Sequence, residues 1–156
     1  MKVRTLLFAS SLVLGAGCGG GARSFVGTYS VTGTRTFNLS ALGLEGTLPV
    51  TGTIHITEGI SSDINILNDK ACLIPADVDG SVAKLVTLAK GTMCDEEAQL
   101  VSGDILQVHH TVTTATAKRE DKTITLVFAG PVSTTYKGTP LSGELSTDLT
   151  LTPIKE

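Results

Sequence analysis

The sequence predicts an all-β protein, an antiparallel meander of about eight strands that forms a closed or nearly closed barrel. Twenty-two threonines follow residue 17, and threonine favours pleated, half-buried surfaces over helices. Apolar and polar residues alternate along several segments, which gives each segment one face for a core and one for water. Turn sequences rich in glycine, asparagine and aspartate recur about every dozen residues, a spacing typical of all-β domains.

The alternation and the turn residues set the limits of the expected strands. The strands are expected at 25–39, 48–58, 63–67, 71–76, 81–88, 105–118, 123–129 and 139–152. In the last strand, Leu141, Leu145 and Leu149 share one face. The four charged residues at 119–122 separate two alternating segments and predict a hairpin turn.

Between the strands, the sequence predicts one helix-like stretch and one loop. The stretch 95–100 begins with three acidic residues, which suit a helix N-terminus. Pro131 and Pro140 are expected to bracket the loop. Pro49 is expected near the start of its strand, where a missing hydrogen-bond donor is tolerated.

Closure of the sheet is expected because an open meander leaves two exposed strand edges. About eight strands is the number at which a small barrel closes around side chains or one small ligand. Gly33, Gly52 and Gly143 lie within expected strands and suit bends in a strongly curved sheet. A two-sheet β-sandwich is the alternative.

The first strand begins Phe25-Val26-Gly27-Thr28-Tyr29, with an aromatic residue two positions after a glycine. This resembles the opening strand of the lipocalins, with tyrosine where that family has tryptophan. The resemblance implies a barrel. In addition, residues 27–34 and 46–53 are identical at six of eight positions. Duplicated strands that pair as neighbours would explain this, and chance similarity in a chain rich in threonine and glycine is the alternative.

The N-terminal segment has the features of a secretory signal. Lys2 and Arg4 precede an apolar run at 5–14, and small residues then lead to Cys18. The run is too short to cross a bilayer core of about 30 Å, which takes roughly 20 apolar residues. An uncleaved anchor or a buried first helix is the alternative, but the glycines that follow the run would weaken such a helix.

This segment resembles the signal peptide and lipobox of bacterial lipoproteins. Gly15 stands three positions before Cys18, where leucine is commonest in that family. The resemblance implies cleavage before Cys18, acylation of that residue and attachment to a membrane of the cell envelope. Gly19 follows the cysteine in place of an aspartate that retains some lipoproteins at the inner membrane, which favours the outer membrane. The chain then divides into a signal peptide at 1–17, a lipidated cysteine and flexible tether at 18–23, and one β domain at 24–156.

Charge and cysteine content fit an exported domain. The fifteen acidic residues all follow residue 17, together with ten basic residues, and a mildly acidic domain has no electrostatic footprint for nucleic acid. With Cys18 used by lipid, Cys72 and Cys94 remain as an even pair in an oxidising compartment. We expect a disulfide between them, worth about 3 kcal/mol on the chain-entropy model. Two buried free thiols are the alternative.

The histidines do not predict a metal site. His109 and His110 are consecutive on an expected strand, so their side chains point to opposite faces. His110 shares the apolar face and is expected in the core, whereas His55 is expected to point outward. Residues 77–80, Asp-Val-Asp-Gly, have the spacing of a calcium-loop fragment, but the residues that follow supply almost no further ligands. A turn between strands is the better interpretation.

No catalytic residue and no cofactor are predicted. No serine lies in a Gly-x-Ser-x-Gly motif, and no cysteine remains for a Cys–His pair. The leading hypothesis is a non-enzymatic envelope lipoprotein that binds a small apolar ligand or another envelope component. The alternative is a hydrolase that uses scattered acids together with His109 or His110.

Overall fold

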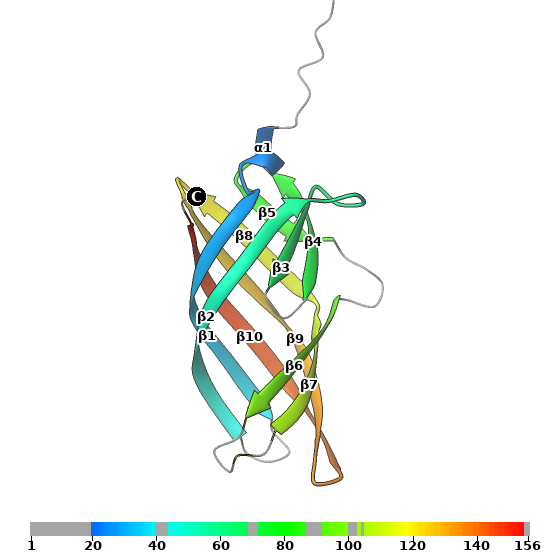
Figure 1. Ribbon diagram of the computed structural model, residues 1–156. Coiled ribbons are helices and arrows are strands. Elements are labelled where there is room, and N and C mark those ends of the chain that lie inside the picture. The colour runs from blue at the N-terminus through cyan, green and yellow to red at the C-terminus, as the bar shows by residue number, and fades with distance from the viewer. Residues whose placement is uncertain are drawn as a thin grey trace, which may run out of the picture.

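The structure of the protein is a computed structural model that describes residues 20–39, 44–68, 72–86, 92–99, 103 and 105–154. The predicted signal peptide and Cys18 lie outside the described residues. Within these, one short helix precedes ten strands of a single antiparallel sheet (Figure 1). The elements are α1 (Gly20–Arg23), β1 (Gly27–Leu39), β2 (Leu44–Glu58), β3 (Ile64–Asn68), β4 (Leu73–Asp79), β5 (Val82–Leu85), β6 (Thr92–Gln99), β7 (Ile105–Val112), β8 (Thr114–Glu120), β9 (Thr123–Tyr136) and β10 (Thr139–Pro153).

Eight of the described strands form a ring. The hydrogen-bonded order β1-β2-β3-β4-β5-β8-β9-β10 returns to its start because β10 pairs with both β9 and β1. The predicted all-β class and the closed or nearly closed arrangement are therefore confirmed, with one sheet in place of a two-sheet sandwich. The strands that carry the sequence echo, β1 and β2, pair as antiparallel neighbours.

Strand length differs around the ring. β1, β2, β9 and β10 have 13 to 15 residues, whereas β3, β4, β5 and β8 have 4 to 7. The eight-stranded ring is therefore complete only in the half nearer α1 (Figure 1). In the other half, β7 replaces β8 on the edge of β9, and β6 pairs with β7.

The core is formed by the alternating apolar side chains of the ring strands. On β9, Ile124, Leu126 and Phe128 are buried, while the residues between them are exposed or half-buried. Leu145, Leu149 and Leu151 of β10 are buried in the same way. The period of two that predicted these strands therefore also predicted which face packs inward.

The single helical turn α1 lies at the end of the ring where β1 begins and contacts β4 (Figure 1). A flexible tether was expected there, but the N–H groups of Ser24 and Phe25 donate to carbonyls within the turn. Phe25 is fully buried, and the Tyr29 hydroxyl donates to its carbonyl oxygen at 2.7 Å. Burial raises the pKa of Tyr29, against a smaller opposing effect of Arg119.

The helix predicted at 95–100 is wrong over its described residues. These lie in β6, which pairs with β7 along its whole length. The carboxylates of Asp95 and Glu97 hydrogen-bond side chains of β7 instead of capping a helix. Cross-strand contacts therefore outweigh the local helix signal of the acidic residues.

The single strand predicted at 105–118 is two strands, β7 and β8, which follow one another along the same edge of β9. The break at Thr113 lies beside Gly130 of β9. A β-carbon on Gly130 would collide with the carbonyl oxygen of Thr111, so the missing side chain allows the close approach at this junction.

The loop predicted between Pro131 and Pro140 is also wrong, because β9 continues to Tyr136 and the turn to β10 holds only Lys137 and Gly138. Pro131 lies where β9 passes from β8 to β7, a junction that tolerates a missing hydrogen-bond donor. The predicted turns at 119–122 and at 77–80 are confirmed by the β8–β9 and β4–β5 hairpins.

Candidate functional site

A cavity opens through the wall of the ring where β2 loses a neighbour. β2 pairs with β1 along 13 positions of register, but with β3 only from Ile54 to Glu58. Among the described strands, none pairs with the second edge of β2 over 44–53. Residues 48–54 border a cavity of about 280 Å³ at this edge. Known small-molecule sites start at roughly this volume.

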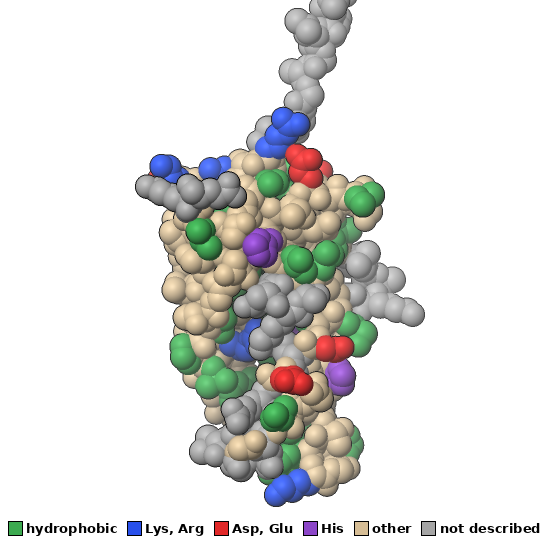
Figure 2. Space-filling model, in the orientation of Figure 1, with side chains coloured by type: hydrophobic (Ala, Val, Ile, Leu, Met, Phe, Trp, Pro, Cys, Tyr) green, Lys and Arg blue, Asp and Glu red, His purple; other side chains and the backbone are tan. Residues whose placement is uncertain are grey.

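The cavity is lined mainly by apolar side chains from several strands. Leu126 and Phe128 of β9, with Leu149 of β10, contribute buried side chains from strands that do not pair with β2. Leu48 of β2 is 54% exposed at the mouth. The other lining residues are Val31, Arg35, Pro49, Val50, Thr51, Gly52, Thr53, Ile54, Ile66, Cys72 and Ile74. On the face drawn in Figure 2, outward hydrophobic side chains occur only in small separate groups.

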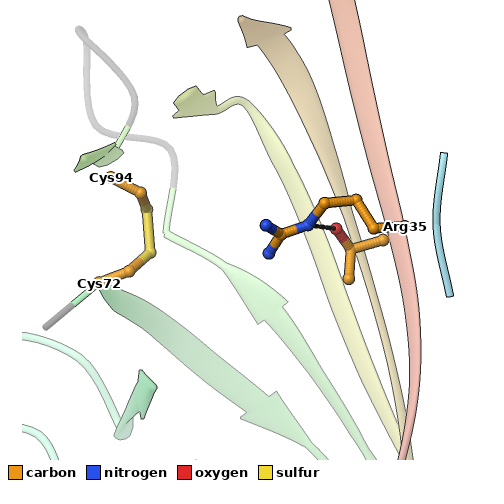
Figure 3. Close-up of a disulfide and its surroundings, with 4 residues drawn as sticks. Arg35, Cys72 and Cys94 are labelled. Atoms are coloured by element: carbon orange, nitrogen blue, oxygen red, sulfur yellow. Dashed lines mark hydrogen bonds between the residues drawn. A yellow bond between two sulfur atoms is a disulfide. The ribbon is translucent and has the colours of Figure 1, made fainter. Parts of the chain in front are cut away.

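Among the described residues of this lining, Arg35 is the charged one. It lies on β1 between Leu48 of β2 and Thr147 of β10, in phase with the buried Val31. Its Nε donates a hydrogen bond to the Thr147 hydroxyl oxygen at 3.4 Å, and Thr147 is fully buried. Figure 3 shows the half-buried side chain of Arg35 extending from β1 toward the side on which the disulfide lies.

The structure joins Cys72 and Cys94 by the disulfide that the cysteine count predicts. Both residues are buried, and the bond connects the residue before β4 with β6 (Figure 3). Cys72 also lines the cavity. The bond therefore ties β6, which pairs only with β7 among the described strands, to the ring beside the cavity.

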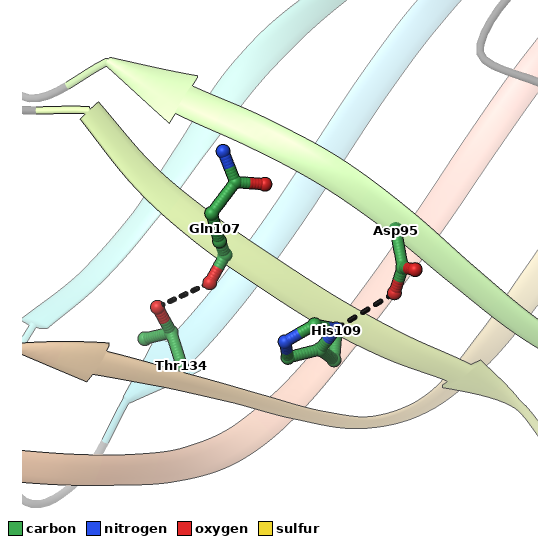
Figure 4. A network of polar contacts seen from close by, with 4 residues as sticks. All are labelled: Asp95, Gln107, His109 and Thr134. Atoms are coloured by element: carbon green, nitrogen blue, oxygen red, sulfur yellow. Dashed lines mark hydrogen bonds and ion pairs between the residues drawn. The ribbon is translucent and has the colours of Figure 1, made fainter.

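The structure separates the three histidines. His55 is exposed, and its Nδ1 lies 3.1 Å from the Thr28 hydroxyl. His109 is on the outer face, where its Nδ1 lies 2.7 Å from Asp95 Oδ1 (Figure 4). His110 is 1% exposed, and its ring stacks on Phe128 with a centroid distance of 6.0 Å. The predicted opposite orientation of His109 and His110 is confirmed.

On the outer face around His109, a second exposed pair links β6 and β7, because the Gln107 amide donates to Glu97 Oε1 at 2.8 Å (Figure 4). The buried Thr134 of β9 donates its hydroxyl to the Gln107 carbonyl oxygen at 2.6 Å (Figure 4). These contacts fasten β6 and β9 to β7. In the part of the chain that the structure describes, no group of three potential metal ligands lies together.

No helix among the described residues is long and apolar enough to cross a membrane. No protein-family model, curated protein or solved structure matches the chain.

Sequence reasoning missed Arg35 as a site residue. The signal was present, because residues 29, 31, 33, 35 and 37 alternate with threonine, serine and asparagine along the first strand. That alternation places an arginine on the inward face, where a charge is unusual. The position of the cavity itself could not be predicted, because it depends on how far β3 extends along β2.

Proposed function

We propose that the protein is a non-enzymatic envelope lipoprotein, anchored by lipid on Cys18, whose β domain holds a small apolar ligand. The observation that carries this proposal is the cavity of about 280 Å³ beside β2, with its lining of aliphatic and aromatic side chains. A ligand that covers such apolar surface gains about 25 cal/mol of binding free energy for each Å² that it removes from water.

The mouth of the cavity suits ligand exchange without unfolding of the ring. It lies at the edge of β2 that no described strand covers, so entry does not require ring hydrogen bonds to break. In the half of the ring that contains the mouth, β10 stays hydrogen-bonded to both β1 and β9.

The proposed lipid anchor determines which half of the β domain, and so which side of the cavity, lies nearer the membrane. α1 is at one end of the ring, and the unpaired part of β2 lies in the half farther from it (Figure 1). With lipid on Cys18, two residues before α1, the α1 end faces the membrane. The mouth of the cavity, in the wall of the ring, then lies in the half of the domain that is farther from the bilayer.

Native mass spectrometry of the protein extracted from its own membrane tests the proposal. We expect a population heavier than the lipidated chain by the mass of one small apolar molecule, which is lost when the protein is unfolded. Protein that carries only its lipid anchor, and that takes up no added apolar ligand after delipidation, would contradict the proposal.

A further inference from the structure

The end of the ring that carries α1 also carries three exposed apolar side chains. Val26 precedes β1, Ile60 lies in the turn between β2 and β3, and Ile154 follows the last residue of β10. Because β10 pairs with β1, β1 with β2 and β2 with β3, these positions follow one another along the rim of the ring (Figure 1). Val26 is 41% exposed, Ile154 is 46% exposed and Ile60 is fully exposed. We refer to these three residues as the apolar rim.

We infer that the apolar rim enters the surface of a phospholipid bilayer and gives the β domain a second membrane contact besides the lipid on Cys18. A single exposed apolar residue is ordinary in a soluble protein, whereas several that share one edge mark a contact surface. The position of this edge selects the bilayer as the partner, because it lies at the end of the ring from which the chain continues toward Cys18 (Figure 1). This inference rests on the lipid anchor of the proposed function.

The short connection to the anchor makes a small apolar contact sufficient. Only Gly19 lies between Cys18 and the first residue of α1. Each step along the chain spans at most about 3.6 Å, so α1 stays close to the acylated residue. The apolar rim therefore meets the bilayer at a high effective concentration, and a contact too weak to hold a free protein becomes populated in an anchored one.

The ion pairs at this end of the ring are compatible with contact to lipid. Arg23 of α1 pairs with Glu58 at the end of β2, with 3.6 Å between Nε and Oε1. Lys118 and Glu120, at the end of β8, pair at 2.7 Å. Each pair has no net charge, so it adds neither net attraction nor net repulsion toward charged headgroups. The contact is therefore expected to depend on apolar area, and zwitterionic phosphatidylcholine is a suitable probe.

Tryptophan fluorescence on vesicles tests the inference, because the chain has no tryptophan of its own. The lipidated full chain, purified from its own membrane, is reconstituted on phosphatidylcholine vesicles with or without bromine on the acyl chains. Bromine quenches a tryptophan that enters the apolar region of the bilayer. The Ile60→Trp and Ile154→Trp variants place the reporter on the apolar rim at exposed positions. We expect both variants to lose most of their emission on the brominated vesicles.

The matched control is Ile105→Trp, which makes the same replacement at a 63% exposed position where β7 begins, at the opposite end of the ring (Figure 1). Its emission should be equal on both kinds of vesicle. Unquenched emission from both rim variants in protein that floats with the vesicles would overturn the inference and leave the lipid anchor in place. Equal quenching at all three positions would do the same. Protein that does not float with the vesicles would overturn the anchor, and the inference with it.

Discussion

Close backbone approaches at single glycines allow the long strands to curve into a ring. Gly143 of β10 and Gly33 of β1 lie where the neighbouring strand passes so close that a β-carbon would meet its backbone. At Gly143 the obstacle is the carbonyl oxygen of Asn38, which cannot move without shifting β1. Glycine is needed at these two predicted bends because it leaves room for the neighbouring strand, and not because of its backbone freedom.

We predict that Gly143→Ala destabilises the protein by about 1–3 kcal/mol, as expected when an extra carbon is forced into a packed site. The measurement is the urea midpoint, with the neighbouring exposed Ser142→Ala as control. Equal midpoints for the two variants would show that β1 and β10 relax freely at this point.

Arg35 shows how far residue-scale reasoning reaches. The alternation along the first strand is sufficient to assign its inward orientation. Its hydrogen bond to Thr147, which is 112 positions away, depends on the register between β1 and β10 and could not be read from local sequence.

At the scale of elements, β6 is the strand that was not predicted from the sequence. Its acidic residues favour a helix N-terminus locally, and its alternation is weak. It is a strand because β7 offers it a complete edge, because Asp95 and Glu97 find partners there, and because Cys94 is bonded to Cys72. Strands such as β9 and β10 were easier to predict because their apolar and polar residues alternate clearly.

We predict that replacing both Cys72 and Cys94 by serine lowers the free energy of unfolding by about 3 kcal/mol, because the closed loop no longer restricts the unfolded chain. Urea denaturation of the variant against its parent measures the difference.

The bond itself is checked by alkylating denatured protein without reductant and weighing it. No label should appear on Cys72 or Cys94, whereas prior reduction should allow both to be labelled. Two labelled thiols in the unreduced sample would contradict the disulfide.

At the scale of the whole molecule, the sequence predicted the class and the closure of the sheet but not its incompleteness. Alternation and turn spacing give the number of strands only approximately, and they say nothing of which strands are long enough to stay paired. The lateral cavity exists because four strands of the ring are much longer than the other four. The long strands are β1, β2, β9 and β10, and the short ones are β3, β4, β5 and β8.

The proposed anchor predicts the location of the whole chain. Cys18→Ser should move the protein from the membrane fraction to the soluble fraction, because the acyl chains that bind the bilayer would be lost. The double variant of Cys72 and Cys94 should stay with the membrane. Membrane retention of the Cys18→Ser protein would contradict lipid anchoring at this residue.

The most direct test of the apolar cavity uses the absence of tryptophan from the chain. Leu48→Trp places one fluorescent reporter at the mouth, and Val127→Trp places one on the outer face of β9, outside the cavity lining. Titration with decanol should shift the emission of the Leu48→Trp protein to a saturating value and leave that of the Val127→Trp protein unchanged. No saturable change at position 48, or the same change at both positions, would contradict a ligand site beside β2.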